Sequence, residues 1–190
     1  MAKKKSSTSL IVKIILLVLA ALMVVSIFTD LVTVKNEKAD EITTRITGQD
    51  TFETMFEGHE VEGKDLLNEE NAGKNTLKGF ATANDDEHKF IVVMLEICFV
   101  VAIIAGIACL VLSLLSILGI NLGIIHKIVA LVFMIASVLT FIFALVVGNV
   151  MAKESNQLIE MYNGMAGVGA WFTLVCGLAY GATYIATSRK

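Results

Sequence analysis

Four long apolar blocks dominate this chain of 190 residues. They cover residues 9–29, 90–118, 124–150 and 167–187. A helix rises about 1.5 Å per residue, so about 20 apolar residues cross a hydrocarbon core about 30 Å thick. Each block reaches that length. With 56% hydrophobic and 17% charged residues, the composition excludes a soluble enzyme domain, a disordered chain and a disulfide-rich secreted module. We therefore predict an all-α membrane protein, a four-helix transmembrane bundle.

Basic residues near the ends of the blocks predict the orientation. Lys3, Lys4 and Lys5 precede the first block, Lys127 (beside His126) lies near the link between the second and third, and Arg189-Lys190 follow the fourth. These segments lack acidic residues and lie on one side of a protein with four spans. Because basic residues are enriched in cytoplasmic segments, we expect both termini in the cytoplasm and the protein in the cell membrane.

The first block could also be a cleaved signal peptide. Lys13 interrupts it, the apolar run is too long, and no small-x-small cleavage site follows, so we interpret it as a span. We expect Lys13 to extend toward the cytoplasmic headgroups. The chain then divides into a cytoplasmic N-terminus (1–8), span one (9–29), an acidic extracytoplasmic loop or cap (30–89), span two (90–118), a cytoplasmic turn (119–123), span three (124–150), an extracytoplasmic loop (151–166), span four (167–187) and a cytoplasmic C-terminus (188–190).

The segment 30–89 contains fifteen Asp and Glu against seven Lys and Arg, a net charge of about −8. The stretch Glu41–Gly48 (EITTRITG) is rich in Thr and Ile, which favours a strand. Asp50 followed by Glu53 resembles a capping box that starts a short helix ending at Gly58. These signals favour a compact α+β cap on the ends of the spans. Disorder of this segment is the alternative.

The three cysteines, Cys98, Cys109 and Cys176, all lie inside the spans. The outer loop therefore has none with which to form a disulfide, and the chain has no Asn-x-Ser/Thr sequon. Both observations favour a bacterial cytoplasmic membrane. We interpret the cysteines as small apolar packing groups.

Small residues recur at helical spacing in the last three spans. Because lipid provides no hydrophobic drive between helices, such residues carry their association by letting backbones approach closely. They predict packing within the bundle, with a homo-oligomer through span four as the alternative. The candidate packing residues are Gly169, Thr173, Gly177, Gly181, Ala144, Gly148, Ala102 and Gly106.

Glu96 is the acidic residue within an apolar block, and ionisable residues in the membrane often mark functional sites. From Ile97 to Leu118 the chain already has enough apolar or small residues to span. Glu96 can therefore lie at the outer headgroups or in the base of the cap. An ion, proton or ligand role, together with Asn149 in the outer half of span three, is the functional alternative. A hydrogen bond within the packing is the third.

The run Asp85, Asp86, Glu87 and His88 gathers oxygen ligands and one imidazole before span two. It is a candidate weak cation site, but metal-ligand spacing is missing, and a solvated helix N-terminus explains the acids equally well. No P-loop, GxSxG, HExxH or CxxC motif is present. We expect no enzymatic activity, no resident metal, no cofactor and no nucleic-acid partner.

The stretches Ile46–Gly58 (ITGQDTFETMFEG) and 167–181 (GVGAWFTLVCGLAYG) resemble small uncharacterised four-span membrane proteins of Gram-positive bacteria. That resemblance implies a fold but no activity. Claudins share the layout of a large first outer loop and a short inner turn, but the Trp-rich motif and cysteine pair of their loop are missing here. The likeness to claudins is therefore one of topology.

Three functions remain open. A large acidic cap on spans that lack catalytic motifs favours a non-enzymatic interaction or assembly subunit. Its expected partners are the lipid bilayer and a membrane or envelope protein, with a homo-oligomer as a further possibility. Glu96 and Asn149 favour a transporter or channel subunit as the alternative. A membrane enzyme is the third and has no motif in its favour.

Overall fold

The computed structural model describes residues 2–36, 41–57, 77, 86–120, 122–155 and 162–188. Four long helices make up most of this part of the chain: α1 (Ala2–Val25), α4 (Asp86–Ile117), α5 (Gly123–Ser155) and α6 (Val168–Ser188). Within the described ranges, four segments are long and apolar enough to cross a membrane: Leu10–Phe28, which runs from α1 through the short 3₁₀ turn after it, Lys89–Ile117 in α4, Gly123–Lys153 in α5 and Val168–Thr187 in α6. The prediction of four apolar helices is confirmed.

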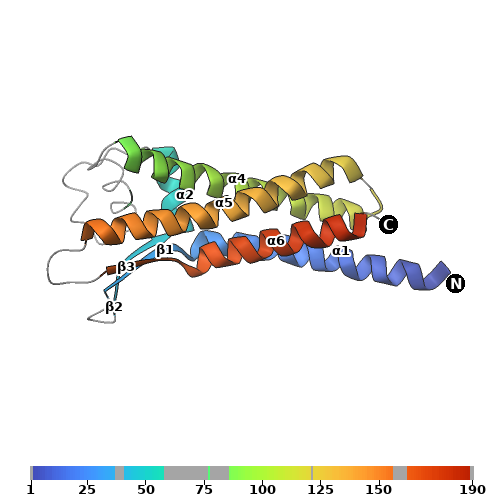
Figure 1. Ribbon diagram of the computed structural model, residues 1–190. Coiled ribbons are helices and arrows are strands. Elements are labelled where there is room, and N and C mark those ends of the chain that lie inside the picture. Colours follow the sequence, from blue (N-terminus) through green and yellow to red (C-terminus); the bar gives the residue numbers. More distant parts are fainter. Residues whose placement is uncertain are drawn as a thin grey trace.

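The helices form a closed ring in which α4 packs between α1 and α5, and α6 packs between α5 and α1. Both termini lie at one end of the bundle, and the strands lie at the other (Figure 1). The core is built from large apolar side chains at the helix contacts, among them Met23, Phe99 and Phe133. The two ends of the bundle therefore differ in kind, one carrying a folded cap and the other the chain ends and a turn.

The turn between α4 and α5 ends α4 in a Schellman motif. Gly119 has φ +92°, a backbone conformation that favours glycine. The Ile120 amide donates to the Leu115 carbonyl at 2.9 Å, and the Gly119 amide donates to the Ser116 carbonyl at 3.3 Å. These two bonds satisfy carbonyls that the end of the helix would leave free.

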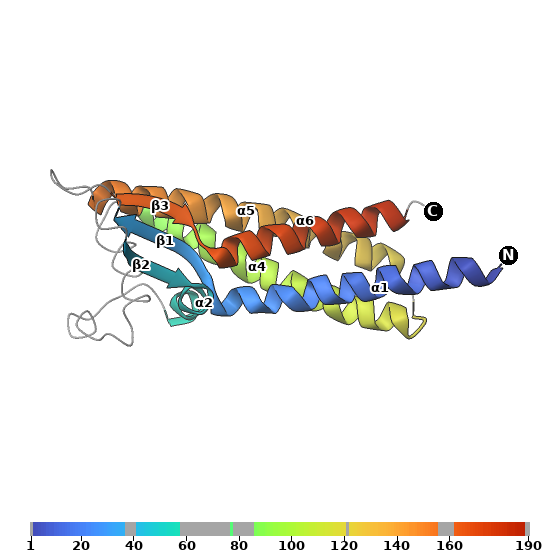
Figure 2. The ribbon, with the colours of Figure 1, turned by 90° about the horizontal axis from the view of Figure 1, so that it is seen from below.

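A small antiparallel sheet covers the other end of the bundle (Figure 2). Its strands are β1 (Asp30–Asn36), β2 (Glu41–Thr47) and β3 (Tyr162–Ala166), in the order β2-β1-β3. The fold is thus mostly helical rather than all-α. The sequence predicted a strand at β2 but gave 151–166 as a loop and the cap as a product of the first loop alone. In the structure, β3 comes from the second outer loop and pairs with β1.

Very short connections join the sheet to the spans. One 3₁₀ turn, η1 (Ser26–Phe28), leads from α1 toward β1, and one residue separates β3 from α6. That residue, Gly167, donates its amide to the Leu31 carbonyl at 2.8 Å. A Cβ on Gly167 would collide with the Asp30 carbonyl. The starts of β1 and α6 are therefore held in direct backbone contact.

Helix α2 (Gly48–Glu57) follows β2 directly. Its capping box begins at Thr47, three residues earlier than the sequence predicted. The Asp50 amide donates to Thr47 Oγ1 at 3.1 Å, and the Thr47 amide donates to Asp50 Oδ2 at 2.8 Å. Thr47 is thus the N-cap residue, and Asp50 is the third helical residue, whose side chain bonds back to the amide of the N-cap.

Candidate functional site

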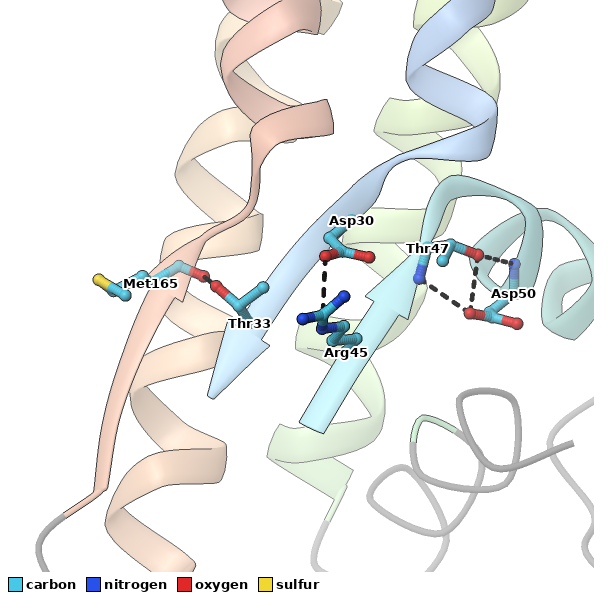
Figure 3. A network of polar contacts seen from close by, with 6 residues as sticks. All are labelled: Asp30, Thr33, Arg45, Thr47, Asp50 and Met165. Atoms are coloured by element: carbon cyan, nitrogen blue, oxygen red, sulfur yellow. Dashed lines mark hydrogen bonds and ion pairs between the residues drawn. The ribbon is translucent and has the colours of Figure 1, made fainter. Parts of the chain in front are cut away.

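The polar contacts of the cap hold its strands to one another and to α2 (Figure 3). Arg45 on β2 lies 3.9 Å from the carboxylate of Asp30 at the start of β1, and Thr33 Oγ1 donates to the Met165 carbonyl on β3 at 3.5 Å. Because the Arg45 side chain is 62% exposed, water screens this ion pair and it adds little stability. These contacts have a structural role.

Glu96 is buried, with 1% of its surface exposed. It lies on the buried face of α4, one turn before Phe99, whose ring abuts the start of α2 at Gly48. Glu96 is therefore enclosed by the protein, near the point where α2 packs on α4. Burial of an acidic side chain at the level where α1 ends is the most unusual chemical feature of this end of the molecule.

Asn149 has a different environment. Its side chain is exposed on α5, and Nδ2 donates to the Leu145 carbonyl of its own helix at 2.8 Å. One of the two residues with a predicted pathway role is thus inside the protein and the other is on its surface.

Only part of the candidate cation site lies within the described residues. Asp85 lies outside the described residues, and Asp86, Glu87 and His88 form the first turn of α4, with side chains that are not described. Within the described part of the chain, no group of three His, Cys, Asp or Glu side chains could hold a metal ion.

The predicted packing residues lie at contacts within the chain. Gly169 faces Thr29 at the end of η1, Gly177 faces Ser137 of α5, and Gly181 faces Met134 of α5. The remaining five, Gly106, Gly148, Ala102, Ala144 and Thr173, are also buried. The glycine ridge of α6 is therefore used inside the bundle.

A shallow apolar hollow of about 250 Å³ lies between α4 and α5. Its lining is entirely aliphatic and consists of Val101, Ile104, Ala105, Ala108, Ile128, Val129 and Val132. Such a surface fits hydrocarbon, from a lipid chain or another helix, rather than a polar solute.

A buried polar cluster lies near the end of the bundle that carries the termini. Its centre is the hydroxyl of Tyr180 on α6, which is fully buried. Ser113 Oγ on α4 lies 2.8 Å from this oxygen, His126 Nε2 on α5 lies 2.5 Å from it, and the Cys109 carbonyl lies 3.2 Å from it. The hydroxyl thus links three helices.

One hydroxyl can satisfy all three contacts. A phenol has one proton and two lone pairs. If Tyr180 donates to the Cys109 carbonyl, it can accept from Ser113 and from a proton on His126 Nε2. This assignment fixes the His126 tautomer and leaves none of the three groups without a partner, which matters because unpaired polar groups are costly in a low-dielectric interior.

Three further contacts lie beside the cluster, nearer the chain ends. The ring of Tyr184 stacks on His126 with centroids 4.1 Å apart, and its hydroxyl donates to the Gly123 carbonyl at 3.1 Å. Lys13 donates to the Ser116 carbonyl. The sequence predicted that Lys13 extends toward headgroups, whereas in the structure it caps the C-terminus of α4, where a positive charge offsets the helix dipole.

Sequence reasoning missed this cluster. His126 was placed beside the link, and Ser113 and Tyr180 look like ordinary members of apolar spans. Counting residues from this end of each span could have found them, because His126 is the fourth residue of α5, while Ser113 and Tyr180 lie four and eight residues before the ends of α4 and α6. The cluster can join α4, α5 and α6, and interhelical hydrogen bonds are a recognised means of doing so in membranes.

Comparison with protein-family models, with curated proteins and with solved structures finds no match to this chain. The class follows from the structure itself. Four helices that could each cross a bilayer, with a sheet built from both connections at one end, describe a multi-pass membrane protein by length and composition.

Proposed function

We propose that this protein is a non-enzymatic assembly subunit of the bacterial cell membrane, which presents its sheet to another envelope protein. In this proposal both termini are cytoplasmic and the sheet is extracytoplasmic. Charge supports the orientation, because the sequence that begins with β1 and ends before span two, 30–89, is strongly acidic, whereas Lys3 to Lys5 belong to the first turns of α1 and Lys127 to the first turns of α5.

The observation that carries the proposal is the edge of the sheet at β2. Within the described part of the chain, β2 pairs on one side with β1, and no strand pairs with its other side. An exposed edge presents backbone donors and acceptors that can pair with an extended segment of another protein. Ile42, with 44% of its surface exposed, offers an apolar side chain for such a contact.

The cap is also suited to holding a bound partner at a fixed position relative to the bundle. Val32 on β1 and Met165 on β3 lie against Gly148 of α5, so a face of the sheet packs on a spanning helix. A partner held on the sheet would be held in a defined geometry relative to the bundle, which is what an assembly subunit requires.

Site-specific photo-crosslinking in native membranes tests the proposal. A benzophenone amino acid at Ile42 should give a discrete adduct with another envelope protein. The matched control places it at Ile104, which is 61% exposed at mid-span on α4 and should give lipid adducts. No protein adduct at Ile42, or the same adducts at both positions, would contradict the proposal.

Orientation has its own test. In a variant with Cys98, Cys109 and Cys176 replaced by alanine, a single cysteine placed at Leu122, in the turn between α4 and α5, should resist a membrane-impermeant maleimide in intact cells and react after lysis. One at Ile42 should react in intact cells. The reverse pattern would show that the sheet is in the cytoplasm.

The burial of Glu96 favours a second candidate, a transporter or channel subunit with this carboxylate on the pathway. An acidic side chain with 1% exposure in an apolar span is the kind of residue that marks ion or proton pathways. In this proposal Glu96→Gln abolishes ion or proton flux in proteoliposomes, while Asn149→Ala, on the protein surface, leaves it unchanged. Equal flux in wild type and Glu96→Gln would exclude that role.

A further inference from the structure

Helix α2 exposes its apolar side chains and buries threonines, the reverse of the usual pattern for a helix packed on a protein. Thr51 and Thr54 are fully buried, whereas Phe52, Met55 and Phe56 are 37%, 36% and 68% exposed. The threonine hydroxyls donate to carbonyls of the preceding turn, at Thr47 and Asp50, so they need no polar partner across the interface. The apolar side chains must then face something other than the bundle.

The position of α2 places its first turn at the outer limit of the first span. The Gly48 amide donates to the Thr29 carbonyl at 3.1 Å, and Thr29 directly follows the candidate span Leu10–Phe28. Phe28, at the same level, is 71% exposed. Phe, like Trp and Leu, is common on the apolar face of helices that lie at this depth, where the bilayer core meets the headgroups.

Helix α2 also lies across the long axis of the bundle. It is seen from the side in Figure 1 and nearly along its axis in Figure 2, after a rotation of 90° about the horizontal axis. If α1, α4, α5 and α6 cross the bilayer, α2 runs parallel to the bilayer surface. This is the orientation of an interfacial amphipathic helix.

The faces of α2 are arranged for such a surface. Successive residues are about 100° apart, so Met55, Phe52 and Phe56 share an arc of about 100° that includes Gly48. A Cβ at Gly48 would point at the Phe99 ring, 2.6 Å away, and at Ile27 Cα, 2.8 Å away. Both residues belong to candidate spans. This side of α2 is therefore turned toward the level of the spans. Asp50 lies about 170° around the helix from the centre of the apolar arc, and Glu53 about 110° from it, on the side turned away from the spans.

We propose that α2 is a membrane-interface helix, whose apolar arc of Phe52, Met55 and Phe56 inserts at the boundary between headgroups and acyl chains of the outer leaflet. The occupant of this face is the lipid bilayer. The arc continues the apolar surface of the spans at their outer end, through Phe28, whereas the acidic arc is suited to water. The helix then fixes the depth of the cap on the membrane, independently of any partner on the sheet.

Spin-label accessibility in proteoliposomes tests this inference. Full-length protein with Cys98, Cys109 and Cys176 replaced by alanine receives a nitroxide at Phe56→Cys, and at Phe52→Cys as a second probe of the arc. Glu53→Cys, about 60° around the helix from Phe56 and about 100° from Phe52, at the edge of the acidic arc, is the matched control. The vesicles are phosphatidylcholine, and each label is exposed to oxygen, which concentrates in lipid, and to a water-soluble nickel chelate.

The labels at positions 52 and 56 should be severalfold more accessible to oxygen relative to nickel than the label at position 53. Equal, nickel-dominated accessibility at all three positions would show that α2 lies in water and overturn the inference. Shielding of positions 52 and 56 from both reagents would show that protein covers the arc, from this chain or a second copy, and would overturn it as well.

Discussion

Replacing Tyr180 by phenylalanine tests whether the buried polar cluster holds α4, α5 and α6 together. The change removes one oxygen atom and leaves the ring, which packs edge-on against Phe133 with centroids 5.8 Å apart. Three contacts are lost: those to Ser113, to His126 and to the Cys109 carbonyl. The loss therefore reports on the hydrogen bonds rather than on apolar packing.

The magnitude follows from the number of contacts. Interhelical hydrogen bonds in membrane proteins average about 0.6 kcal/mol each, so three contribute about 2 kcal/mol. Because about 1.4 kcal/mol corresponds to a tenfold change, Tyr180→Phe should shift the unfolding equilibrium roughly 25-fold toward the unfolded state. The buried imidazole of His126 would lose its partner on Nε2, which adds to the cost.

Equilibrium unfolding in mixed micelles, with increasing fractions of sodium dodecyl sulfate and helicity or steric trapping as the signal, measures this loss. Tyr184→Phe is the matched control, because it removes the same atom one turn away on α6, where the side chain is only half-buried and the hydroxyl makes one hydrogen bond, to the Gly123 carbonyl. It should cost well under half as much. In a double-mutant cycle, Ser113→Ala and Tyr180→Phe should be strongly non-additive. A Tyr180→Phe variant as stable as the wild type would refute the reasoning.

Three further substitutions test the close backbone contacts and the C-terminal end of α4. Gly164→Ala should destabilise the protein by about 1–3 kcal/mol, because the added Cβ would collide with the carbonyl of Gly148, and limited proteolysis of the cap should speed up. Gly119→Ala should cost about 1 kcal/mol in the same unfolding assay, since it forces a non-glycine residue to φ +92°. Lys13→Met should lower the thermal unfolding temperature, because it removes the bond to the Ser116 carbonyl, and Lys13→Arg should restore most of the loss.

Controls separate these effects from general intolerance. Gly106→Ala places its Cβ 3.1 Å from the flexible side chain of Met23, so it should be tolerated better than Gly164→Ala, and equal losses would count against the contact described. A cap whose proteolysis is unchanged by Gly164→Ala would show that β3 does not need its close approach to α5. Equal stability of Lys13→Met and wild type would show that the lysine adds nothing at the end of α4.

The apolar helices were predictable because length and composition decide them. The strand at β2 and the short helix after it were also predicted, since Thr and Ile enrichment and a capping pair are local signals. The sequence placed the start of that helix at Asp50, and the structure places the cap at Thr47. Asp50 and Glu53 have the spacing of a capping box, and so do Thr47 and Asp50. The local sequence does not show which of these two overlapping pairs starts the helix.

The third strand and the polar cluster depend on contacts far apart in the chain. Tyr162–Ala166 (YNGMA) has little strand propensity of its own, and it becomes a strand because β1 offers an edge and Gly164 lets its backbone approach α5. Likewise, Tyr180 and His126 acquire a role only when three helices meet at one depth. Such features are set by tertiary packing, which local sequence patterns do not encode.

The pairing of β1 with strands from two different connections determines the order in which the sheet can be assembled. Synthesis and membrane insertion proceed from the N-terminus, so in the proposed orientation β1 and β2 would be delivered to the outer side first, with one edge of β1 unpaired. That edge is filled only after β3 has been translocated, which requires α4 and α5 to have been inserted on either side of their turn. Completion of the sheet thus marks the moment at which α5 has been inserted and β3 delivered, so that a chain stalled before β3 would leave one edge of β1 unpaired at the membrane surface.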